Sequence, residues 1–280
     1  MKQDISVMLI TYEMAQQKLK EDSADKKILE LLSATKGFQI DSLTSLSAKQ
    51  LLGVADRLEI TEASVRMSLS RQTKQGKLIR ENASYSLTSS KQPFILPRFW
   101  LDLTQRCGPW KNDWFLVNLG HQKFKPTIMR RLQRKADLLG LKFIPSLGWI
   151  RPNNLTDLNS EVTFHFGLVT GTEHLLTTTM HGLSANWQTE FAQLWKTDEM
   201  NLCYQHNLAF IKQEQKLLDE LDSQDILVRS FAVGRLIVEY LANDPWLPDN
   251  MIDYHSRNQI VEEAMKYYQK IMPDWLSALN

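Results

Sequence analysis

The side chains with the clearest chemical pattern lie between residues 61 and 80. A helix starting after Thr61 would bury one face and expose another, and the exposed residues would be Ala63, Arg66, Met67, Ser70 and Lys74, with Arg71 at the edge. A small polar residue flanked by Arg and Lys suits the acceptors and phosphates of a DNA major groove. We therefore expect these residues to contact DNA: Thr61, Ala63, Arg66, Met67, Ser70, Arg71, Lys74, Lys77 and Arg80.

The charge balance of this stretch points the same way. From Thr61 to Arg98 there are seven basic residues and two acidic ones, and a basic excess is what the phosphate backbone attracts. The alternative is structural, because short amphipathic helices and hairpins also occur in domains that never meet DNA. On that alternative, Arg66 would pair with Asp56 or Glu59.

The neighbouring pattern predicts the elements that hold this helix. Apolar positions 48, 51, 52 and 55 share one face of a preceding helix of about three turns, and residues 58–60 interrupt it. Thr61 fits an N-cap and Gly76 fits the position just after a helix. Residues 77–80 and 84–88 alternate like two strands joined by the turn 81–83. Together they predict a helix-turn-helix followed by a wing, preceded by a helix that buries Ile28, Leu31 and Leu32.

Composition places the chain among soluble globular proteins. It has 280 residues, 43% hydrophobic and 23% charged, enough for two or three domains. Residues 1–160 hold 25 Lys and Arg against 15 Asp and Glu, whereas residues 161–280 hold 8 against 17. The basic half suits a polyanion. Two distant cysteines argue against a disulfide framework or zinc cluster. Without a signal peptide or membrane span we expect a cytoplasmic protein.

The rest of the chain predicts two further domains and an α+β fold. Residues 114–119, 141–144, 148–151 and 161–169 read as strands, with a helix over 126–139 that begins at Pro126. This β-α-β-β order favours a ferredoxin-like sandwich. Helices are expected over 185–195, 198–221, 224–241 and 257–271. The predicted domains are a winged helix at 1–90, a linker and ferredoxin-like domain at 91–183, and a helical domain at 184–280.

The order of these segments resembles the PaaX-type repressors of phenylacetic acid catabolism. Residues 62–71 look like the family's E-x-x-V-R-x-x-L-x-R helix, and 76–78 and 85–88 are similar to its Gly-Lys-Leu and Tyr-x-Leu-Thr segments. Residues 114–119, 138–141 and 148–150 are similar to its middle domain, and the DPWLP motif at 244–248 to its helical tail. The resemblance implies a homodimeric DNA-binding repressor, released from an operator by an aryl-CoA thioester.

A second basic face offers a place for such an effector. Arg130, Arg131, Arg134 and Lys135 lie at i, i+1, i+4 and i+5 of the predicted helix. Such a face could hold the phosphates of an acyl-CoA or contact DNA a second time. The alternative is an ordinary solvated helix face.

Enzymatic chemistry is less well supported by the sequence. His165, His174 and His181 are nine and seven residues apart, which does not place two ligands on one helix turn, so no metal site is expected. A nuclease-like middle domain would need a carboxylate at the end of its first strand, where the chain has Asn118. We therefore expect no enzyme. The alternatives kept open are a nucleic-acid-processing enzyme and a winged-helix scaffold that binds protein.

Overall fold

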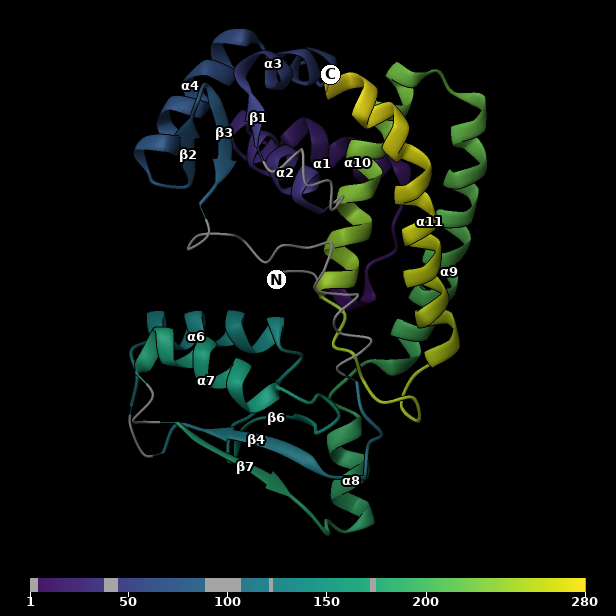
Figure 1. Cartoon of the computed structure of the whole chain (residues 1–280). Coiled ribbons are helices and arrows are strands. Elements are labelled where there is room, and N and C mark those ends of the chain that lie inside the picture. The colour runs from purple at the N-terminus through teal and green to yellow at the C-terminus, as the bar shows by residue number, and fades with distance from the viewer. Residues whose placement is uncertain (1–4, 38–44, 89–106, 121–122, 172–174, 280) are drawn as a thin grey trace. The chain divides into compact units, whose positions relative to one another are not determined.

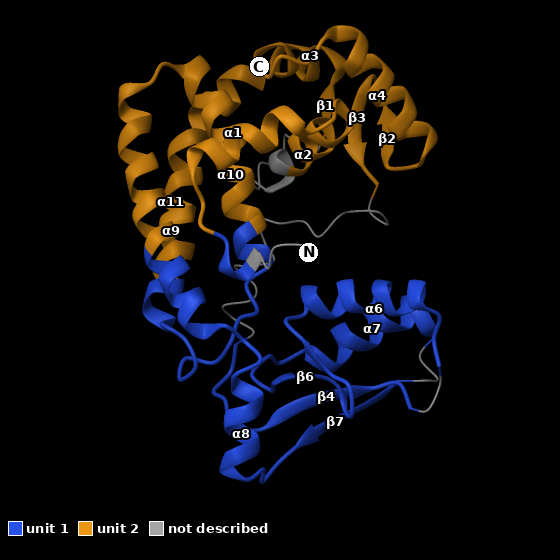
Figure 2. Ribbon diagram, turned by 180° about the vertical axis from the view of Figure 1, so that it is seen from behind, with its two compact units in different colours: residues 1–8, 102–205, 240–257 blue, residues 9–101, 206–239, 258–280 orange. Residues whose placement is uncertain are grey.

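The computed structural model describes residues 5–37, 45–88, 107–120, 123–171 and 175–279, and all structural statements refer to these ranges. The structure is α+β, with helices predominating and two antiparallel sheets in the described part (Figure 1). Its residues group into two compact units made of separate segments (Figure 2). Unit 1 comprises 1–8, 102–205 and 240–257, and unit 2 comprises 9–101, 206–239 and 258–280.

These two units do not coincide with the three consecutive stretches 1–90, 91–183 and 184–280. The division of the chain into those three domains stays a prediction. Unit 2 brings the N-terminal segment together with helices from the C-terminal third. Arg229 lies 3.6 Å over the ring of Tyr12, and Gln50 donates from Nε2 to the carbonyl of Leu279 at 2.5 Å. The linker expected over residues 89–98, around the start of the second predicted domain, lies outside the described residues.

Unit 2 contains the predicted helix pair and hairpin. Its N-terminal elements are α1 (Tyr12–Glu21), α2 (Ala24–Gly37), β1 (Leu46–Ser47), α3 (Ala48–Arg57), α4 (Glu62–Lys74), β2 (Leu78–Glu81) and β3 (Ser84–Leu87). The strands pair in the order β1-β3-β2. The C-terminal helices are α9 (Thr197–Leu217), η4 (Leu218–Glu220), α10 (Ser223–Ala242) and α11 (Tyr254–Leu279). Of these, α9 and α11 begin in unit 1, and α10 ends in it.

Local chemistry explains where α3 begins and which face it buries. The Ser47 hydroxyl accepts from the Gln50 amide, and the Gln50 side chain accepts from the Ser47 amide, which forms a capping box. Leu51 and Ala55 are buried, as the spacing predicted. The burial of Ile28, Leu31 and Leu32 on α2 is likewise confirmed.

Unit 1 contains a four-stranded antiparallel sheet. Its elements are η1 (Ile5–Val7), β4 (Trp114–Asn118), α6 (Pro126–Leu138), β5 (Lys142–Ile144), β6 (Gly148–Pro152), α7 (Leu158–Thr170), β7 (Leu176–Met180) and α8 (Ala185–Ala192). The strand order is β5-β6-β4-β7. The predicted strands at 114–119, 141–144 and 148–151 and the helix from Pro126 are confirmed.

The predicted strand at 161–169 is wrong, because these residues belong to α7. Val162, Phe164 and Phe166 alternate along the sequence, which suggests a half-buried strand. In the structure Val162, His165 and Phe166 are buried at helical spacing, whereas the Phe164 side chain is 61% exposed. The last strand of the sheet is instead β7, whose threonine-rich sequence has little apolar alternation.

The helical series after Ser184 is confirmed in outline, and its last helix is longer than expected. The helix predicted over 257–271 continues as α11 to Leu279, with Pro273 inside it. Ile271, Trp275 and Leu279 are all buried. Their spacing keeps one apolar face against the core, and this packing outweighs the disturbance that an interior proline causes.

The DPWLP segment is held by a buried polar network within unit 1. Arg151, 1% exposed, donates to the carbonyls of Leu139 and Pro245. Asp244 accepts from the Tyr204 hydroxyl at 2.8 Å and from the Trp246 amide at 2.7 Å. Burial raises the pKa of the Asp244 carboxyl. These hydrogen bonds satisfy backbone groups of residues 244–248, a segment that is buried although it forms neither a helix nor a strand.

Candidate nucleic-acid interface

Helix α4 begins and ends where the sequence predicts. Thr61 is its N-cap, and the hydroxyl accepts from the Ser64 amide at 3.3 Å. At the other end Gly76 has φ 64° and donates to the Thr73 carbonyl, while Lys77 donates to that of Gln72, both at 2.9 Å. This is a Schellman ending, which favours glycine because of the positive φ. Both ends of α4 are therefore fixed by local bonds.

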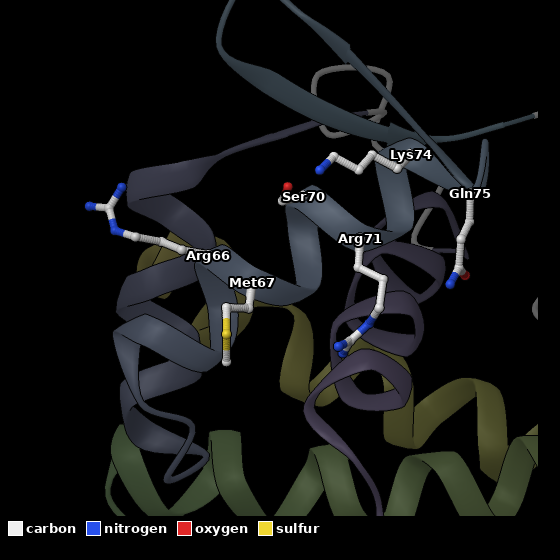
Figure 3. Close-up of a pocket in the computed structure, with 6 residues that line it drawn as sticks. All are labelled: Arg66, Met67, Ser70, Arg71, Lys74 and Gln75. Carbon is white, nitrogen blue, oxygen red and sulfur yellow. The ribbon is translucent and has the colours of Figure 1, made fainter.

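The two faces of α4 are also as predicted. Val65, Ser68, Leu69 and Gln72 are buried. The opposite face is open and forms a hollow of about 640 Å³ lined by Arg66, Met67, Ser70, Arg71, Lys74 and Gln75 (Figure 3). The Met67 side chain is 62% exposed, and Thr61 and Ala63 are exposed at the start of the helix. The structure thus brings six of the predicted contact residues onto one surface: Ala63, Arg66, Met67, Ser70, Arg71 and Lys74.

Arg66 pairs with Glu62 one turn earlier, not with Asp56 or Glu59. Its Nε lies 2.7 Å and its Nη2 2.5 Å from Glu62 Oε1. The side chains are 64% and 62% exposed. Exposed pairs at this spacing contribute only about 0.3–0.5 kcal/mol, so a stronger partner can take Arg66 from Glu62.

Arg71 has a partner on another helix that local sequence reasoning missed. Its Nε lies 2.8 Å from Asp25 Oδ2 and its Nη2 2.5 Å from Asp25 Oδ1, a two-pronged contact with α2. The hydrogen bonds from Arg71 hold the pKa of the Asp25 carboxyl below its usual value. The two residues are 46 positions apart, and no spacing rule connects them.

Lys74, Lys77 and Arg80 continue the basic surface toward the hairpin. Lys74 and Lys77 are exposed, and within the described ranges neither forms an ion pair. Arg80 lies 5.7 Å over the ring of Tyr85 across the β2–β3 pair. Asn82 and Ala83 have φ values of 48° and 63°, so both central residues of the turn adopt the left-handed conformation of a tight hairpin.

The second basic face lies on α6 in unit 1. Arg130, Arg131 and Arg134 are exposed and Lys135 is half-buried, while Leu132 and Ala136 turn inward. Arg134 Nε donates to the Arg130 carbonyl at 3.3 Å. In the part of the chain that the structure describes, no carboxylate forms an ion pair with these four residues. The structure therefore brings the predicted effector residues together on one helix, in a different unit from α4.

Other candidate chemistry has structural partners. His165 is buried, with Nε2 3.4 Å from Glu161 Oε2, His181 is exposed, and His174 lies outside the described residues. Asp113, the acidic residue just before β4, accepts from the Asn153 side chain at 2.8 Å. Among the described residues no three His, Cys, Asp or Glu side chains are placed to share a metal ion. None of the described helices is long and apolar enough to span a bilayer.

Comparison with known proteins gives the fold alone. The chain matches no family model and no curated protein. Among solved structures it is similar to uncharacterized protein Rv0674 from Mycobacterium tuberculosis, with a TM-score of 0.57 and 18% identity. The match covers 90% of this chain and 98% of the other. The arrangement of elements is therefore shared along nearly the whole of both chains.

Proposed function

We propose that this protein is a sequence-specific regulator that binds double-stranded DNA through a winged helix-turn-helix in unit 2. In this proposal α3 and α4 are the helix pair, α4 is the recognition helix, and β2–β3 is the wing. The observation that carries it is the open face of α4, where arginine, lysine and small or apolar side chains surround one hollow. No catalytic step is part of the proposal.

Each exposed side chain suits a different part of a duplex. Arg66 can donate two hydrogen bonds to guanine once it leaves Glu62, and the Ala63 and Met67 side chains can contact thymine methyl groups. Lys74 and Lys77 suit phosphates, which add affinity without reading sequence. A recognition helix reads bases mainly through its N-terminal residues, which is where Ala63 and Arg66 lie.

Three finer features belong to the same proposal. The β-α-β-β-α-β order of unit 1 with strand order β5-β6-β4-β7 supports a ferredoxin-like domain. A homodimer on two half-sites would give one winged helix enough contacts for specificity. The resemblance to PaaX-type regulators favours a repressor that an acyl-CoA releases from DNA.

The α6 face is the proposed site for the phosphates of that effector. Replacing Arg131 and Arg134 with glutamate should abolish the response to acyl-CoA thioesters and leave DNA affinity near normal. Calorimetry with a panel of acyl-CoAs measures the binding, and operator titrations with and without ligand measure the response. Weaker DNA binding with an intact ligand response would instead make α6 a DNA contact.

DNA binding itself is tested by selection from a random duplex library with the full chain. We expect an enriched sequence that binds more tightly than a scrambled duplex of equal composition. Lys74→Ala should weaken binding to both duplexes and reduce the slope of log affinity against log salt by about 0.9. Lys216→Ala is the control, because Lys216 is exposed in the last turn of α9, a helix that lies away from α4 in both views (Figures 1 and 2). Equal effects of the two variants, or no enriched sequence, would contradict the proposal.

A further inference from the structure

Arg71 contacts Asp25 through only part of its guanidinium. Nε and Nη2 each donate one hydrogen bond to the carboxylate. A guanidinium has five N–H groups in a rigid plane, so three are left that donate to none of the described residues and are directed away from Asp25. The Arg71 side chain is 54% exposed and lines the hollow on α4. Figure 3 shows it turned away from Ser70 and Lys74, toward the flank of the face.

The position of Asp25 is fixed in part by ion pairs between the region of α2 and α10. On α2 and the residues just before it, Asp22 and Glu30 both pair with Arg235 of α10, and Glu30 Oε2 lies 2.5 Å from Arg235 Nε. The Arg235 side chain is 14% exposed, far less than Arg66. Because the Asp25 carboxylate already holds the Arg71 side chain in place, Arg71 loses little further conformational entropy when its remaining N–H groups bind a ligand.

Asp25 also cancels the charge of Arg71. The pair is formally neutral, and Lys77 is near enough to lower the pKa of the Asp25 carboxyl further, after the larger effect of Arg71. A neutral pair attracts a DNA backbone weakly at a distance, since non-specific affinity grows with the number of uncompensated positive charges. Its remaining N–H groups can still donate to a phosphate that arrives in the right place.

We propose that Asp25 is a specificity-determining positioning residue, which fixes Arg71 so that it binds one phosphate only when α4 is seated in register on its operator. Asp25 suppresses the charge of Arg71 elsewhere on DNA. This inference rests on the proposed function, and it assigns to α2, outside the helix-turn-helix, a part in discriminating operator from other DNA.

The test compares Asp25→Asn and Asp25→Glu with the wild-type chain on the selected operator and a scrambled duplex, across a range of salt. For Asp25→Asn we expect the salt slope on scrambled DNA to steepen by about 0.9 and the affinity for it to rise roughly fivefold near 0.15 M salt. The affinity of Asp25→Asn for the operator should not rise. The ratio of operator affinity to scrambled-duplex affinity therefore falls about fivefold or more. Asp25→Glu keeps the charge but moves the carboxylate, so the ratio should fall with no change of slope.

Glu220→Gln is the matched control, because it removes one exposed negative charge from η4 in the same unit and changes no residue of α2 or α4. Each variant is compared below its unfolding temperature, which circular dichroism gives. A lowered melting temperature with unchanged slope and ratio would make Asp25 only structural and overturn the inference. Equal gains on operator and scrambled DNA would do the same, since Asp25 would then only weaken binding. If the wild-type chain prefers no sequence, the proposed function itself fails.

Discussion

Replacing Arg66 tests whether α4 reads bases or only carries charge. Arg66→Lys keeps the positive charge and the reach toward Glu62 but removes the planar fork that matches a guanine edge. Arg66→Ala removes both. Arg66 is suited to the test because its side chain is 64% exposed and, among the described residues, its hydrogen bond and ion pair are both with Glu62.

The expected loss follows from what Arg66 leaves and what it gains. Breaking the exposed Glu62 pair costs about 0.3–0.5 kcal/mol, and a fork contact with guanine contributes about 1–3 kcal/mol. The net contribution of Arg66 is then about 0.5–2.7 kcal/mol, or roughly 2- to 80-fold in operator affinity. Arg66→Ala should show this loss on the operator. Arg66→Lys should lose operator affinity by a similar factor, because the point charge of lysine cannot replace the two directed donors of arginine.

The assay is fluorescence anisotropy on operator and scrambled duplexes at several salt concentrations. Arg66→Lys should keep the salt slope and the affinity for scrambled DNA, and should relax selection at one operator position. An Arg66→Lys variant with wild-type operator affinity and selectivity would show that Arg66 acts as a charge alone. Unchanged binding by Arg66→Ala would mean that α4 is not the recognition helix.

Three further predictions concern stability, pH and assembly. Gly148→Ala should destabilise unit 1 by about 3 kcal/mol or more, measured by denaturant unfolding, because φ is 119° and a Cβ would lie 2.3 Å from the Val117 carbonyl oxygen. Because the pKa of Asp25 is lowered in the folded chain, its stabilising contribution is present above its unfolded pKa and lost as pH falls through the folded value. The gap in melting temperature between wild type and Arg71→Ala should therefore close below about pH 4. Light scattering should give a dimer, with half-sites one or two helical turns apart, and a monomer both free and on DNA would exclude this.

The sequence alone determined the elements that depend on neighbouring residues. The cap at Thr61, the glycine ending at Gly76 and the two faces of α4 follow from hydrogen bonds and spacings within one or two turns of helix. The same holds for Pro126 at the start of α6. These features can be predicted from the sequence because each is decided by residues within one or two helical turns of one another.

Local pattern failed where two local structures fit the same residues. Residues 161–169 have apolar side chains at both alternating and helical spacing, and packing decided in favour of a helix that buries Val162, His165 and Phe166. Strand β7 was missed for the converse reason. Its side chains are largely threonine, and pairing with β4 rather than apolar alternation makes it a strand.

Only the tertiary structure decided which distant residues meet around the candidate site. Asp25 and Arg71 are 46 positions apart, and Asp22 meets Arg235 across 213 positions. Nothing in either local sequence selects these partners, because the contacts exist only once the fold has brought α2 beside α4 and α10. The sequence therefore determined which side chains α4 presents, and the packing of α2 determined that Arg71 is held and neutralised while Arg66 is easily released.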